Sequence, residues 1–153
     1  TLIAAVAQIF VTIAMGRLSE KIGPGKVTMW GGILTAAAAF PIFAMVDTKS
    51  TPMIMLAITL GIVLIAVAYA VNGALLTELF PPKLRYSGVA LGYNIAGATS
   101  GFMPLLATAM LGFSGNQSWG GALILAIIAV ITAVGGFLGE RLRVQDKRIV
   151  SAD

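Results

Sequence analysis

"MIMLAITLGIVLIAVAYAVNGALLT", residues 53–77, is a run of twenty-five residues that carries no charge. A helix needs about 20 predominantly apolar residues to cross the hydrocarbon core of a bilayer. Because lipid offers no hydrogen-bond partners, such a segment must satisfy its backbone groups internally, and a helix does so. The stretch therefore predicts a transmembrane helix.

Four more apolar runs surround this one and extend the prediction to the whole chain. The composition agrees, since 58% of the residues are hydrophobic and only 10% are charged, against about 25% charged in a soluble domain. We predict an all-α integral membrane protein with a bundle over 1–143 and a cytoplasmic tail over 144–153. Its five transmembrane helices are expected at residues 2–15, 27–46, 53–77, 87–111 and 121–138. The first run is short and follows Thr1 rather than a methionine, so we expect a partial sequence.

The cations between the apolar runs predict the orientation. Lys49 is the only cation in the second and fourth connections. The first connection, the third connection and the tail hold the other nine: Arg17, Lys21, Lys26, Lys83, Arg85, Arg141, Arg143, Lys147 and Arg148. Because cytoplasmic loops carry an excess of Lys and Arg, these three segments and the C-terminus are expected in the cytoplasm. Cations grouped in this way indicate membrane orientation and no nucleic-acid partner.

The residue types that are missing argue against catalysis. The chain has no histidine and no cysteine, and no acid lies inside an apolar run. It therefore lacks the usual general base, the thiolate ligand and an intramembrane carboxylate. We predict no enzyme activity, no catalytic residue, no metal site and no cofactor.

The first polar connection, "GRLSEKIGPGKV" at residues 16–27, has an unusual pattern. Gly16 is expected to end one helix, and Glu20 and Lys21 to lie in a short polar turn. The segment Gly23-Pro24-Gly25 is expected to form a second turn before the next span. The simplest interpretation is a solvated connector that obeys the positive-inside rule.

The spacing of glycines and charges in this connection resembles the cytoplasmic signature loop of the major facilitator superfamily. That loop joins the second and third helices of each six-helix half. Glu20 stands where the family more often has Asp, and Pro24-Gly25 replaces the usual basic pair. The resemblance implies a gate in which Glu20 faces a helix N-terminus and arginines of the opposite half. The candidate gate residues are Gly16, Arg17, Glu20, Lys21, Gly23 and Lys26.

A second segment, "TELFPPKLRYSGVALGYNIAG" at residues 77–97, resembles the region before helix 11 of the superfamily's metabolite:proton symporters. That group carries shikimate, citrate, α-ketoglutarate and proline or betaine. The resemblance makes the five runs helices 8–12 of the C-terminal half, in a bacterial inner membrane. It implies a secondary transporter of a small organic acid or zwitterionic metabolite, working by proton symport and alternating access. Its partners would be lipid, substrate, a proton, helix 7 and the N-terminal six-helix half. A self-standing membrane scaffold or assembly protein is the alternative.

Uncharged polar residues within the runs are candidates for lining a transport pathway. By resemblance, helix 10 borders the central cavity, which favours Tyr69 and Asn72. A hydrogen bond between helices is the simpler interpretation of the other candidates, and it explains Tyr69 and Asn72 equally well. The candidate set is Gln8, Tyr69, Asn72, Tyr93, Asn94 and Ser100.

The fourth run contains two glycine pairs with GxxxG spacing, which permits close approach of neighbouring helices. At about 100° per residue, Gly97 and Gly101 share a small, polar face with Tyr93, Asn94, Ser100 and Pro104. Gly88 and Gly92 lie near the edge of the bulkier face. We expect the Gly97 and Gly101 face to form a sliding contact with the other half. The predicted helix-packing residues are Gly88, Gly92, Gly97, Gly101 and Pro104.

Overall fold

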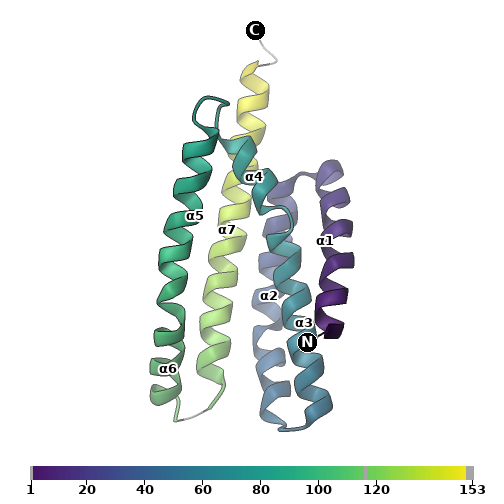
Figure 1. Cartoon of the computed structure of the whole chain (residues 1–153), viewed down its shortest axis with the longest axis vertical. Helices are drawn as coiled ribbons and strands as arrows, with labels where there is room; N and C mark the ends of the chain where they lie inside the picture. The colour runs from purple at the N-terminus through teal and green to yellow at the C-terminus, as the bar shows by residue number, and fades with distance from the viewer. Residues whose placement is uncertain (1, 116, 151–153) are drawn as a thin grey trace.

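The computed structural model describes residues 2–115 and 117–150, and almost all of them are helical (Figure 1). This confirms the all-α prediction. The helices are α1 (Leu2–Ile22), α2 (Pro24–Asp47), α3 (Thr51–Tyr69), α4 (Asn72–Leu79), α5 (Arg85–Gly101), α6 (Met103–Phe113) and α7 (Trp119–Val150).

Four helical stretches in the described part are long and apolar enough to cross a membrane. Two of them consist of a pair of consecutive helices, α3 with α4 and α5 with α6. The four stretches are Pro24–Asp47, Thr51–Leu79, Arg85–Phe113 and Trp119–Gln145. They correspond to four of the five predicted spans, and α1, with 21 residues, covers the first predicted run.

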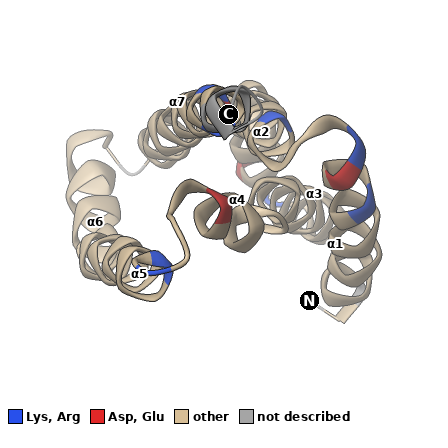
Figure 2. Cartoon of the chain, turned by 90° about the horizontal axis from the view of Figure 1, so that it is seen from above, with Lys and Arg blue, Asp and Glu red and all other residues tan. Residues whose placement is uncertain are grey.

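The chain runs up and down, so the cation-bearing connections meet at one end of the bundle (Figure 1). The C-terminus of α1, both ends of the α4–α5 connection and the C-terminal part of α7 lie there, as does the start of α2. Figure 2 views the molecule from this end and shows Lys and Arg on several of these elements. We call it the basic end and define it by Arg17, Lys21, Lys26, Lys83, Arg85, Arg141 and Arg143. At the opposite end, the Ser118 hydroxyl donates a hydrogen bond to the Asp47 carboxylate and so joins α7 to α2.

The predicted polar loop at residues 16–26 is wrong, because helix occupies nearly all of it. Gly16 lies inside α1, which continues through Glu20 and Lys21 to Ile22. The turn is a single residue, Gly23, with φ of 98°, a conformation that glycine adopts without a steric penalty. Pro24 then opens α2, where its missing N–H costs nothing. A cation in the last turn of α1 also suits the negative end of the helix dipole.

Two predicted runs are interrupted rather than continuous. The stretch 53–77 breaks at residues 70–71, where Asn72 and Gly73, both weak helix formers, begin α4. The stretch 87–111 breaks at Phe102. Pro104 explains this second break, because proline has no N–H and its ring clashes with the carbonyl four residues earlier.

The last helix extends beyond its predicted span. Residues 121–138 were expected to end the membrane segment, but α7 continues to Val150. The predicted tail, 144–153, therefore begins inside a helix, and its last three residues lie outside the described part. Hydropathy marks where the apolar residues stop, and the helix itself continues because charged residues are good helix formers.

The tightest packing in the bundle joins α2 to α7 through residues without bulky side chains. A Cβ on Gly32 would lie 2.6 Å from the Ala133 amide nitrogen, and one on Gly136 would lie 2.6 Å from the Met29 amide nitrogen. Both distances are shorter than van der Waals contact, so only glycine permits this approach. Gly25 approaches α7 in the same way, its Cβ position lying 2.7 Å from the Gly136 carbonyl oxygen.

The predicted glycine pairs of the fourth run do not form this packing. A Cβ on Gly88 would lie 2.5 Å from the Phe80 ring, so Gly88 of α5 packs against the connection that precedes its own helix. The positions of Gly92, Gly97 and Gly101 are open to space among the described residues, and α5 and α6 bury none of their residues. The predicted contact with another half of a transporter therefore stays a prediction.

Candidate functional site

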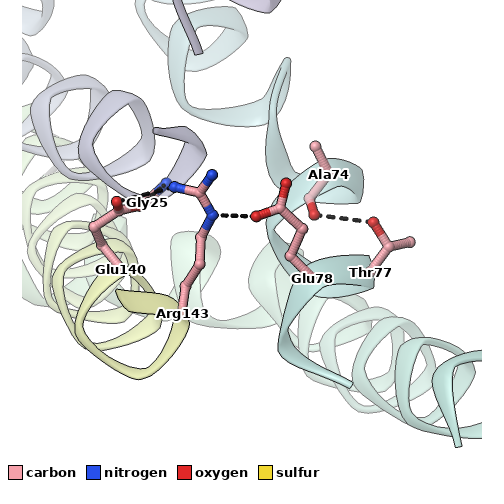
Figure 3. Close-up of polar contacts among 6 residues, drawn as sticks. All are labelled: Gly25, Ala74, Thr77, Glu78, Glu140 and Arg143. Atoms are coloured by element: carbon pink, nitrogen blue, oxygen red, sulfur yellow. Dashed lines mark hydrogen bonds and ion pairs between the residues drawn. The ribbon is translucent and has the colours of Figure 1, made fainter. Parts of the chain in front are cut away.

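A buried carboxylate at the basic end connects two helices. Glu140 of α7 is only 9% exposed. Its Oε2 accepts a hydrogen bond from the Gly25 amide at 3.1 Å, and its Oε1 accepts one from Arg143 Nη1 at 3.1 Å (Figure 3). The first N–H groups of a helix have no partner within the helix and carry partial positive charge. Glu140 therefore caps α2 from a neighbouring helix.

Arg143 extends this connection to a third helix. Its Nε donates a hydrogen bond to a carboxylate oxygen of Glu78 at the end of α4, while its Nη1 donates to Glu140 (Figure 3). The Arg143 side chain is 17% exposed and the Glu78 side chain 40% exposed. Gly25, Glu78, Glu140 and Arg143 form what we call the charge cluster. It joins α2, α4 and α7 at the basic end.

Sequence reasoning missed the acids of the charge cluster and used Arg143 only as an orienting cation. Two signals were present. Glu140 and Arg143 are three residues apart, a spacing that brings side chains together on a helix surface. Glu78 directly follows an apolar run, and so lies at a membrane boundary.

The predicted gate residues are spread over this end of the molecule. Gly23 lies at the charge cluster, because a Cβ there would come within 2.5 Å of Glu140 Oε1. Gly16 lies within α1 and Lys26 is exposed on α2. Arg17, Glu20 and Lys21 are exposed on the last turns of α1 and form no ion pair among residues 2–115 and 117–145, whose side chains are described except for Ile3.

A second feature, a cavity of about 200 Å³, lies between α2, α3, α4 and α7. Tyr69 and Asn72 line it from either side of the break between α3 and α4, with Thr35 and Thr132 from α2 and α7. The two threonine hydroxyls donate to carbonyls of their own helices, at 2.8 and 2.9 Å. The other lining residues are apolar, and we call this the polar cavity after its four polar side chains. Its lining has no ionisable group other than the tyrosine hydroxyl.

The structure brings together two of the six predicted pathway residues, Tyr69 and Asn72. The Tyr93 hydroxyl approaches the same region from α5, lying 4.0 Å from a Cβ position on Gly73. The Asn94 amide and the Ser100 hydroxyl are exposed and donate to carbonyls of their own helix. Gln8 is exposed on α1.

Residues 1–151 match the sequence profile of the Major Facilitator Superfamily, and the chain belongs to this family. It is therefore a membrane chain of a transporter family, not an enzyme. It is 31% identical to a citrate-proton symporter of Klebsiella pneumoniae over 122 residues, 77% of this chain and 27% of that protein.

Other relatives are transporters named for different solutes. A proline/betaine transporter of Salmonella typhimurium is 30% identical over 131 residues, which cover 86% of this chain and 26% of the relative. A shikimate transporter of Escherichia coli is 30% identical over 125 residues, which cover 76% of this chain and 28% of that relative. The matches thus cover about a quarter of the length of these relatives. No solved structure matches the chain.

Proposed function

We propose that this chain forms helices 8–12 of a secondary active transporter for a small organic acid or zwitterionic metabolite. The observation that carries the proposal is the polar cavity beside the break between α3 and α4. Transporters of this kind place their substrate sites at interrupted helices, where backbone groups become available to the solute. Tyr69 and Asn72 flank such a break and offer donors and an acceptor without charge.

The remaining parts of the transporter would complete the site and the coupling. The partners are an N-terminal six-helix half, helix 7, membrane lipid, substrate and a proton, in a bacterial inner membrane with the basic end in the cytoplasm. The described apolar stretches hold their acids only at the ends, as with Glu78 and Glu140. A carboxylate that binds the coupled proton within the membrane would therefore come from another part of the transporter.

Removing one polar group from the polar cavity tests the substrate site. We expect Asn72→Ala to raise the apparent KM for uptake about fivefold, because a lost hydrogen bond to the solute costs about 1 kcal/mol. Uptake of radiolabelled citrate, shikimate, proline and glycine betaine into membrane vesicles identifies the substrate and gives the KM. Thr59→Ala is the control, since Thr59 lies on α3 outside the cavity and bonds to the Met55 carbonyl. An Asn72→Ala protein with unchanged KM for every transported solute would contradict the proposal.

We also propose Glu20 as the acid of a cytoplasmic gate. The other proposed gate residues are Gly16, Arg17, Lys21, Gly23 and Lys26. The exposure of Glu20 at the end of α1 leaves it available to a helix N-terminus or an arginine in the other half. Neutralising it with Glu20→Gln should weaken the closed cytoplasmic state and increase the labelling of a cavity cysteine from the cytoplasmic side several-fold. Glu20→Asp keeps the charge and serves as the control. Equal labelling rates in all three proteins would remove Glu20 from the gate.

A further inference from the structure

A groove of about 570 Å³ runs between the start of α2 and the C-terminal part of α7, at the basic end. It is separate from the polar cavity, and neither Tyr69 nor Asn72 lines it. The residues that matter here are two cations and four apolar side chains: Lys26, Arg141, Met29, Trp30, Phe137 and Val144. Trp30 and Phe137 are 55% and 42% exposed, so this apolar surface is not covered by the described chain.

The positive charge in the groove is not neutralised by the described part of the chain. Glu140 also lines the groove, but Gly25 and Arg143 occupy its two carboxylate oxygens. Lys26 and Arg141 are exposed and form no ion pair among the side chains that the structure describes. The Arg141 guanidinium lies 4.5 Å above the centre of the Phe137 ring, which places it at the boundary between the cationic and apolar parts.

The position of the groove identifies the kind of ligand. Tryptophan is enriched where the hydrocarbon region meets the headgroups, and Lys and Arg at that level are attracted to anionic lipids. A molecule that satisfies both parts needs a negative headgroup and an apolar chain. A free anion would leave Trp30 and Phe137 exposed, and a zwitterionic lipid would leave the charge of Lys26 and Arg141 partly unbalanced.

We propose that this groove binds one anionic phospholipid of the cytoplasmic leaflet. Lys26 and Arg141 hold the phosphate, and an acyl chain lies along Met29, Trp30 and Phe137. Because the groove is formed by α2 and α7 together, the lipid also stabilises the contact between these two helices. The assignment to the cytoplasmic leaflet rests on the orientation given in the proposed function, whereas the binding itself rests only on the groove.

The test counts bound lipid on the protein purified in a mild detergent. Phosphatidylglycerol and phosphatidylethanolamine with identical acyl chains are added separately, and native mass spectrometry measures the bound fraction of each. Wild-type protein is expected to retain one phosphatidylglycerol and to bind phosphatidylethanolamine at least tenfold more weakly. At about 1 kcal/mol per cation, Lys26→Gln/Arg141→Gln should weaken phosphatidylglycerol binding about 30-fold.

Two further variants separate the groove from general charge effects. Lys49→Gln, at the opposite end of the bundle, should bind phosphatidylglycerol like wild type, and Lys26→Arg/Arg141→Lys should also retain it. Unchanged lipid binding in Lys26→Gln/Arg141→Gln would overturn the proposal, as would equal binding of the two lipids. If inorganic phosphate stabilises the protein as much as phosphatidylglycerol does, the groove is an anion site and not a lipid site. Lipid counting requires no transport, so failure here and failure of the proposed transport function are distinguishable.

Discussion

Gly136→Ala is expected to lower the melting temperature of the purified protein by several degrees, whereas Gly135→Ala is expected to leave it unchanged or raise it. A Cβ at Gly136 would lie 2.6 Å from the Met29 amide nitrogen and 2.8 Å from the Gly25 carbonyl oxygen. Both are backbone atoms, so rotation of a side chain cannot relieve the overlap. Overpacking of this kind typically costs about 1–3 kcal/mol.

Gly135 provides a matched control because it is the preceding residue of the same helix. A Cβ there meets nothing within 4 Å among the described residues, and alanine favours helix over glycine by about 1 kcal/mol. Thermal unfolding in detergent, followed by the loss of the monodisperse peak in size-exclusion chromatography, measures the difference. Equal unfolding temperatures of the two variants would contradict the close approach of Gly136 to the backbone of α2.

Arg143→Gln is the second change with a large expected effect. It leaves the carboxylate of Glu140, a residue that is 9% exposed as a whole, without its cation and also removes the connection to Glu78. Removing one member of a buried pair costs about 3–5 kcal/mol. The Arg143 and Glu140 side chains are 17% and 12% exposed, so the pair is not completely buried. We therefore expect the free energy of unfolding to fall by a smaller amount, about 2–3 kcal/mol.

A double-mutant cycle identifies the source of this loss. Glu140→Gln/Arg143→Gln removes both charges and leaves an amide oxygen for the Gly25 N–H, so it should be more stable than Arg143→Gln alone. Glu78→Gln should cost less than about 1 kcal/mol, since Glu78 is 40% exposed and an exposed pair contributes little. The cycle uses the same thermal measurement. If the loss of stability in the double variant equals the sum of the losses in Glu140→Gln and Arg143→Gln, then Glu140 and Arg143 act independently.

Hydropathy predicted the helical class and the up-and-down course of the chain, because lipid forces every long apolar run to satisfy its own backbone. It did not predict where helices begin and end. The helix α1 continues through Arg17, Glu20 and Lys21, since charged residues leave the hydrocarbon region without leaving the helix. The breaks at residues 70–71 and 102 depend on local backbone effects that a count of apolar residues does not register.

The candidate site was predicted in part. Tyr69 and Asn72 could be found because polar residues in a long apolar run are few. The charge cluster could not, since its contacts join residues 65 and 115 positions apart, Glu78 with Arg143 and Gly25 with Glu140. The close glycine contacts between α2 and α7 were missed for a related reason. Spacing identified pairs in the fourth run, whereas Gly32 and Gly136 pack closely because α2 and α7 lie together.

Alternating access at the polar cavity requires that Asn72 be reachable from each side of the membrane in turn, which chemical labelling measures. This chain contains no cysteine, so Asn72→Cys provides a single reporter in it once cysteines elsewhere in the protein are replaced. A membrane-impermeant maleimide is applied to right-side-out and inside-out vesicles, with and without the transported solute. Alternating access predicts labelling from both sides, with a ratio that the solute changes. Labelling from one side only, at a rate that no transported solute alters, would contradict alternating access at this cavity.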